Sequence, residues 1–164
     1  MASATSSPID WGRLYGPVSR WWTGGVTGTN GRGFVTICTL WRDCCLGEVA
    51  EGKVSLSSYG EIVAREWQRI PGRHPRVTLD SWILMPDHLH GILILGPVAQ
   101  EDEIASSLGT IVGQFKSKST KSVRAMYRGF AWQERFHDHI VESHEELNQI
   151  RTYIRQNPER WKNR

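Results

Sequence analysis

MPDHLHGILIL, residues 85–95, combines an aliphatic β-strand with two histidines. The isoleucines and leucines after Gly91 predict a buried strand, and Pro86 marks the break before it. Residues two apart on a strand project from the same face of a sheet, so His88 and His90 are expected side by side. The pair could hold one metal ion, or it could be a hydrogen-bonded structural pair.

The overall composition predicts one soluble globular domain. The chain has 164 residues, of which 39% are hydrophobic and 23% are charged. It has neither an apolar run long enough to span a bilayer nor the order of a signal peptide, so we expect a cytoplasmic protein without membrane contact. The three cysteines, Cys38, Cys44 and Cys45, lack C-x-x-C spacing, which predicts reduced thiols rather than disulfides or a zinc site.

A basic segment lies in the second half of the chain. No Asp or Glu occurs between Ile104 and Gln133, although the net charge of the whole chain is only +3. The cations considered as nucleic-acid ligands are Lys116, Lys118, Lys121 and Arg124. Such a cluster neutralises phosphates well, but a solvated helix face has the same pattern.

The order of the predicted elements indicates an α+β fold. The chain starts with a Gly-, Ser- and Thr-rich segment over 1–31, predicted to be flexible, and residues 32–164 are predicted to form the domain. The expected elements are a strand over 33–40, a hairpin over 47–56 turning at Glu51-Gly52, a helix up to about residue 70, strands over 77–84 and 88–95, a basic helix after 104, a strand or extended loop within 132–141, and a helix over 144–157 stopped by Pro158. Helices segregated from an antiparallel sheet predict a ferredoxin-like sandwich.

The last predicted helix carries two stripes. Its apolar positions are Leu147, Ile150, Ile154 and Trp161. A second stripe at spacing four contains Gln149, Tyr153 and Asn157. These three suit a polar site or an ordinary solvent face. A tyrosine phenol can attack phosphorus and retain the product as a covalent ester.

Such a tyrosine needs help at neutral pH, because the ordinary pKa of the phenol is about 10. A divalent metal that binds phosphodiester oxygens would gather the charge that develops during displacement. Two imidazoles and one oxygen ligand would hold Mg²⁺ or Mn²⁺, and the nitrogen ligands favour manganese. The histidine pair and Tyr153 would therefore complete each other.

Two motifs resemble a known family. MPDHLHGI resembles the H-hydrophobic-H signature of single-tyrosine HUH transposases, and RTYIRQNPERW resembles the Y-I-x-x-N-P block of their REP-associated, insertion-sequence-like branch. The similarity runs in the same order from about Gly33 to Trp161. It implies the ferredoxin-like (RRM-like) fold of HUH endonucleases.

The resemblance also implies an activity and its residues. Members nick and rejoin single-stranded, hairpin-forming DNA through a covalent 5′-phosphotyrosine and release a 3′-hydroxyl. It makes Tyr153 the nucleophile, His88, His90 and Asn157 the metal ligands, and the stretch from Lys116 to Arg124 a DNA-binding surface. It further implies a monomer or homodimer that is nucleoid-associated when bound to DNA.

Alternatives and departures remain open. The chain could be a catalytically decayed DNA-binding protein of the same fold, or a metal-dependent hydrolase that uses water as the nucleophile. Residues 1–31 lack the basic lead-in of such proteins. His137 and His139 form a second H-x-H where relatives usually have an aromatic residue first. We expect His139 to support folding or contact DNA and His137 to be incidental, with a rival metal site as the alternative.

Overall fold

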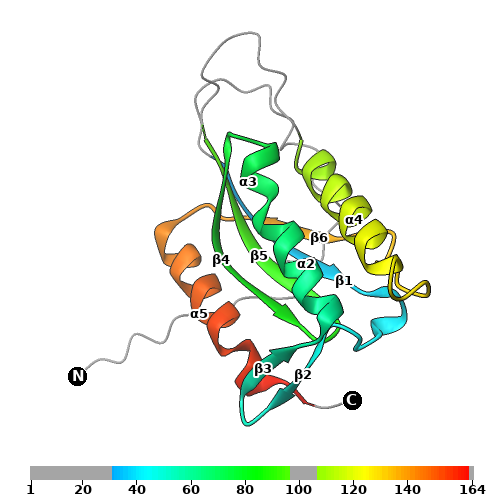
Figure 1. Ribbon diagram of the computed structural model, residues 1–164. Helices are drawn as coiled ribbons and strands as arrows, with labels where there is room; N and C mark the ends of the chain where they lie inside the picture. The colour runs from blue at the N-terminus through cyan, green and yellow to red at the C-terminus, as the bar shows by residue number, and fades with distance from the viewer. Residues whose placement is uncertain (1–30, 97–106, 163–164) are drawn as a thin grey trace.

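An antiparallel sheet forms the centre of the protein (Figure 1). The computed structural model describes residues 31–96 and 107–162. Within these ranges, four strands pair in the order β4 (Val77–Met85), β5 (His88–Leu95), β1 (Gly31–Cys38) and β6 (His137–Ile140). Every neighbouring pair is antiparallel. This arrangement confirms the predicted α+β, ferredoxin-like architecture.

The remaining elements follow the predicted order. They are η1 (Leu40–Arg42), β2 (Gly47–Ala50), β3 (Lys53–Leu56), α2 (Ser58–Gln68), α3 (Ile70–Arg73), α4 (Leu108–Arg124) and α5 (His144–Arg160). The β2–β3 hairpin turns at Glu51 and Gly52, which both have positive φ, as a two-residue turn that matches strand twist requires. In the described parts of the chain, no helix is long and apolar enough to cross a membrane.

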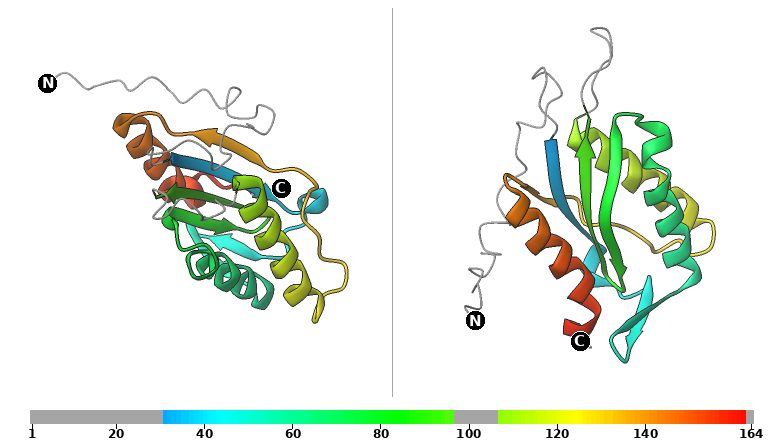
Figure 2. Two further views of the ribbon diagram at one scale, coloured as in Figure 1. Left: turned by 90° about the horizontal axis from the view of Figure 1, so that it is seen from above. Right: turned by 90° about the vertical axis from the view of Figure 1, so that its left-hand side faces the viewer.

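The sheet is covered on both faces. Helices α2 and α4 lie against one face and α5 against the other (Figure 2). Alternation along the strands divides the core accordingly: Val35 and Leu89 pack in the cluster with α2 and α4, whereas Phe34 and Ile92 pack with α5. A side chain at position 91 would clash with Trp67, because a Cβ atom there would lie 2.4 Å from the indole ring, so the close packing of α2 on β5 requires Gly91.

Helix α5 begins where expected but ends later. The Ser143 side chain accepts a hydrogen bond from the Glu146 backbone N–H, which caps the first turn. The prediction that Pro158 stops the helix is wrong, because α5 continues to Arg160. Proline has no N–H to donate one turn back, and near a helix end this single loss is tolerated. Asn157 therefore stays helical, one turn after Tyr153.

The predicted boundary at residue 31 is not tested by the structure. The segment predicted to be flexible lies outside the described residues, apart from Gly31, with which β1 begins. The residues directly after 104, where the basic helix is expected to begin, also lie outside them, and the described helix begins at Leu108 after a Ser107 cap.

Candidate active site

A cavity of about 490 Å³ brings the predicted catalytic and metal-ligating residues together. His88 and His90 reach it from β5, and Tyr153 and Asn157 reach it from α5. It therefore lies on the face of the sheet that α5 covers. All four residues come from one chain.

Sheet register determines how the histidines are presented. On the central strand β1, Cys38 pairs with His88 and Thr36 pairs with His90. Residues directly opposite each other in an antiparallel pair share a face, so these four side chains lie on one side. The two imidazole centroids are 4.4 Å apart.

Each imidazole is oriented through its Nδ1 atom. A hydrogen bond of 2.6 Å joins His88 Nδ1 to Asp87 Oδ1, and one of 2.8 Å joins His90 Nδ1 to Thr36 Oγ1. Partners of this kind fix the ring orientation of metal-binding histidines. The arrangement leaves Nε2 of each ring as the nitrogen available to a ligand.

The Asp87 carboxylate is the central charged group beneath this pair. It is fully buried and also accepts a 2.8 Å hydrogen bond from Arg42 Nε. Burial opposes ionisation, but the hydrogen bonds from His88 and Arg42 outweigh it and lower the pKa of Asp87. Burial, and then the charges of His88 and Arg42, hold the pKa of His90 well below its ordinary value. A neutral imidazole is the form that binds metals.

Tyr153 lies directly against the histidines. Its ring meets that of His90 edge-on, with centroids 5.4 Å apart, and Asn157 is 8% exposed. Helix α5 is held on β4 by Arg151, whose Nε and Nη2 atoms lie 2.8 and 2.6 Å from the Asp80 carboxylate oxygens. The hydrogen bonds from Arg151 lower the pKa of Asp80 to about 2, against the opposing effect of burial.

The donor set is compatible with a divalent cation. Among the described residues, no three His, Cys, Asp or Glu side chains are grouped to hold a metal. A cation would therefore need His88 and His90 together with a different donor, and the Asn157 amide oxygen lines the same cavity. Two imidazoles and an amide oxygen suit a hard or borderline divalent ion. The residues present fit Mg²⁺ or Mn²⁺.

The two histidines of the second H-x-H motif, His137 and His139, lie in different surroundings. His137, expected to be incidental, pairs with Thr36 across β1 and β6 and lines the cavity. The His139 ring hydrogen-bonds to the Glu146 carboxylate in the first turn of α5, a contact that ties β6 to α5. Sequence reasoning also missed Thr36, Asp87 and Arg42; the position of Asp87 directly before the histidines was the one local signal.

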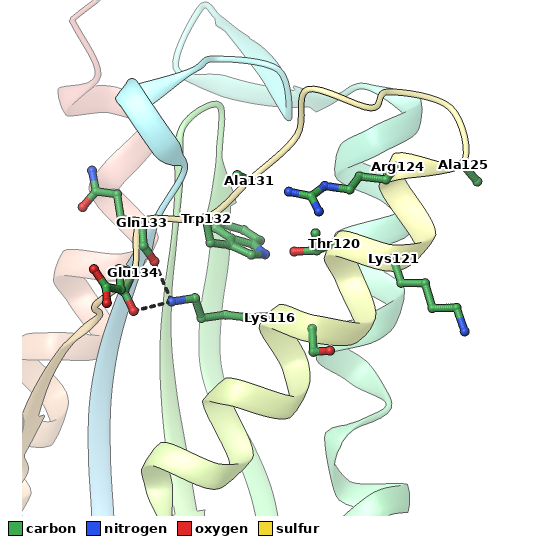
Figure 3. Close-up of a pocket in the computed structure, with 10 residues that line it drawn as sticks. Lys116, Thr120, Lys121, Arg124, Ala125, Ala131, Trp132, Gln133 and Glu134 are labelled. Carbon is green, nitrogen blue, oxygen red and sulfur yellow. Dashed lines mark hydrogen bonds between the residues drawn. The ribbon is translucent and has the colours of Figure 1, made fainter.

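Three of the four predicted DNA-binding cations, all except Lys118, line a second cavity, of about 660 Å³, beside α4 (Figure 3). We call it the basic groove; its lining includes Lys116, Thr120, Lys121, Arg124, Ala131 and Gln133. Lys116 Nζ donates to the carbonyls of Gln133 and Glu134 at 2.6 and 3.0 Å, and burial lowers its pKa. Arg124 Nε donates to the Phe130 carbonyl at 2.8 Å.

These contacts divide the four predicted DNA-binding cations into two kinds. The half-buried Lys116 and the exposed Arg124 donate to backbone carbonyls and fasten residues 130–134 to α4. Lys118 and Lys121 are exposed and do not tie that segment to the helix. Figure 3 places the Lys116 ammonium against that segment and the Lys121 side chain away from it. Whether any of the four binds DNA stays a prediction.

Comparison with known proteins identifies the family. The model of the family described as Transposase IS200 like matches residues 64–157, a range that contains both histidines of β5, Tyr153 and Asn157. The chain belongs to the IS200-like transposase family. An uncharacterised protein of Haemophilus influenzae is 30% identical over 144 residues, which is 78% of this chain and 80% of that protein. The predicted family is thereby confirmed, and it is a family of DNA-processing enzymes.

Two solved structures share the fold of this IS200-like chain. A REP-associated tyrosine transposase bound to a REP hairpin matches with a TM-score of 0.59 and 19% identity, over 81% of this chain and 69% of the other. A candidate transposase from Deinococcus radiodurans R1 matches with a TM-score of 0.52 and 16% identity, over 77% of this chain and 90% of the other. These likenesses confirm the fold.

Proposed function

We propose that this IS200-like transposase nicks and rejoins single-stranded, hairpin-forming DNA through a covalent bond between Tyr153 and a 5′-phosphate. The observation that carries the proposal is that Tyr153, Asn157 and the His88–His90 pair line one cavity within one chain. A nucleophile and a candidate cation site at the same place are what phosphodiester exchange requires.

The reaction consists of two transfers that balance each other. The Tyr153 phenol oxygen attacks phosphorus, the bond from phosphorus to the 3′-oxygen breaks, the phenol loses its proton and the leaving 3′-oxygen gains one. A 3′-hydroxyl then attacks the phosphotyrosine, which restores the phenol and joins the strand. The phosphotyrosine ester conserves the bond energy of the cleaved phosphodiester, so the joining step needs no external energy source.

The cavity residues have distinct roles in this scheme. A Mg²⁺ or Mn²⁺ ion held by His88, His90 and Asn157 would neutralise charge that develops on the phosphate oxygens. Asp87 and Thr36 hold the imidazoles in place through their Nδ1 atoms. Cations from two separate segments also line the cavity and attract the phosphate: Arg42 of η1, and Arg160 and Lys162 at the end of α5.

The DNA partner is inferred from the fold relative and from surface charge. The solved REP-associated relative is bound to a REP hairpin, which supports a hairpin substrate for this chain. Lys121 adds exposed positive charge at the basic groove, and Lys118 adds more elsewhere on α4. The DNA is therefore expected to contact both cavities.

The proposal is tested by trapping the covalent product. Purified protein, a fluorescent single-stranded hairpin oligonucleotide and Mn²⁺ should give a protein–DNA adduct that survives a denaturing gel and is absent in chelator. Tyr153→Phe should lower adduct formation by roughly 10³-fold or more, because the nucleophile is gone, while DNA affinity persists.

Tyr59→Phe is the matched control. Tyr59 lies on α2, on the face of the sheet opposite α5, and does not line the cavity, so this variant should form the adduct normally. Cleavage without an adduct would instead favour a hydrolase that uses water. Binding without cleavage would favour a DNA-binding protein that has lost catalysis.

A further inference from the structure

An exposed tryptophan lies next to the candidate active site. Among the residues that the structure describes, the exposed large hydrophobic side chains are Leu40, Trp41 and Met126. Trp41 is 89% exposed and belongs to η1, the turn directly after the central strand β1. Because this indole adds almost nothing to the core, a role for it must come from the surfaces that the turn adjoins.

The turn lies between the two cavities. Arg42 lines the catalytic cavity, and the Leu40 N–H donates at 2.9 Å to the carbonyl of Ala131, which lines the basic groove. The Gln133 N–H donates at 2.8 Å to the Cys38 carbonyl, and Gln133 lines both cavities. We call residues 38–42 together with 131–133 the ridge, since they separate the cavity from the groove.

The turn is braced on several sides. Trp41 and Arg42 both have left-handed backbones, with φ of 58° and 56°. Thr39 Oγ1 contacts the carbonyls of Asp43 and Asp87 at 2.9 and 3.1 Å, and the Tyr127 hydroxyl donates to Asp43 at 2.9 Å. A turn held this firmly presents the indole to solvent in a defined place.

We propose that the ridge guides a single DNA strand between the catalytic cavity and the basic groove, with one base stacked on Trp41. This inference rests on the proposed function, which makes single-stranded DNA the substrate. Unpaired bases expose their faces, and stacking on an aromatic side chain tolerates any base. Phosphates on either side of that base meet Arg42 at the cavity and Lys121 at the groove.

The test measures binding of a fluorescein-labelled 20-nucleotide oligo-dT by anisotropy. Trp41→Ala and Trp41→Gly should each weaken affinity by about fivefold or more, and Trp41→Phe should stay within about twofold of the original chain. Glycine adopts the left-handed backbone without strain, so a loss shared by Ala and Gly reports the indole. The salt dependence of affinity should not change, because stacking releases no counterions.

Met126→Ala removes another exposed hydrophobic side chain, one that lies outside the ridge, and should bind as the original chain does. Unchanged affinity in Trp41→Ala and Trp41→Gly overturns the proposal, and so does an equal loss in Trp41→Phe. Adduct formation is scored separately. If no adduct forms but binding depends on Trp41, the catalytic proposal is wrong and the proposal that a base stacks on Trp41 is supported. If the adduct forms but binding is independent of Trp41, the stacking proposal is wrong and the catalytic proposal is supported.

Discussion

The two cavities of this transposase hold their polar groups in different ways. In the candidate catalytic cavity, His88 and His90 are buried and each has one ring nitrogen fixed by a neighbour. In the basic groove, Lys121 and Arg124 are exposed, and Lys116 is half-buried and held by two backbone carbonyls. Lys118 is exposed on the same helix, outside the lining of the groove. Chemistry at phosphorus requires fixed atoms, whereas attraction of a phosphate chain requires charge and little geometry. Substitutions in the candidate catalytic cavity should therefore impair adduct formation, whereas substitutions of the exposed cations should impair DNA binding.

Among the substitutions that test this difference between the two cavities, Asp87→Asn should have the largest effect. It replaces the buried charge that orients His88, and loss of such a partner commonly costs about 10- to 100-fold in activity or metal affinity. We expect adduct formation to fall by that factor and the Mn²⁺ concentration for half-maximal activity to rise, with hairpin affinity unchanged. A titration of adduct yield against Mn²⁺ measures both.

Asp43→Asn is the control for this substitution. Asp43 follows η1, the turn whose Arg42 contacts Asp87, but its carboxylate accepts from Tyr127 rather than from a histidine. It should leave the Mn²⁺ titration unchanged. An identical shift in both variants would show that the turn, rather than the orientation of His88, is responsible.

Substitutions on α4 should produce a moderate effect, confined to binding. Lys118→Ala combined with Lys121→Ala should reduce the slope of log affinity against log salt by about 1.4 on single-stranded DNA, or about 0.7 for each lost phosphate contact. Lys116→Ala should change the slope less and lower the free energy of unfolding by about 1 kcal/mol, because Lys116 holds two backbone carbonyls.

Salt titrations of DNA binding and urea unfolding separate these roles of the lysines. If Lys116→Ala flattened the slope as much as the double variant and left unfolding unchanged, the division of the cations into two kinds would be wrong.

The smallest expected effect concerns an ion pair outside both cavities. Asp80→Asn breaks the contact with Arg151, whose side chain is 38% exposed, so solvent screening limits the loss of stability at pH 7 to about 1 kcal/mol. The pKa of Asp80 is lowered to about 2 in the folded chain, below its unfolded value. The stabilisation is therefore complete above pH about 5 and declines as the pH falls towards 2.

Urea unfolding of the original and Asp80→Asn chains at pH 7, 5 and 3 measures this dependence. The difference between the two chains should be equal at pH 7 and 5 and smaller at pH 3. A difference that did not change with pH would exclude the ion pair as its source.

The fold could be predicted because its signals are local. The strand with two histidines, the hairpin at Glu51-Gly52 and the apolar spacing of α5 each lie within one short segment. The end of α5 differs from the prediction because proline propensity alone does not decide it: one lost hydrogen bond near a helix end does not break the helix.

The candidate site could be predicted only in part. His88 with His90, and Tyr153 with Asn157, follow the periods of a strand and a helix, so each pair could be found without tertiary structure. Thr36 lies 54 residues from His90, and only sheet register places the two in contact. No sequence pattern separates Lys116, which is engaged by backbone carbonyls, from the exposed Lys118.

The register of the central strand limits how this chain can evolve. Thr36 pairs with His90 of β5 on one side and with His137 of β6 on the other. The register of β1 therefore sets the positions of both neighbouring strands at the cavity. Inserting or deleting one residue within β1 would turn Thr36 towards α2 and α4 and bring apolar neighbours to the histidines. Point substitutions along β1 can accumulate gradually, but a change of length there would disable the site in one step.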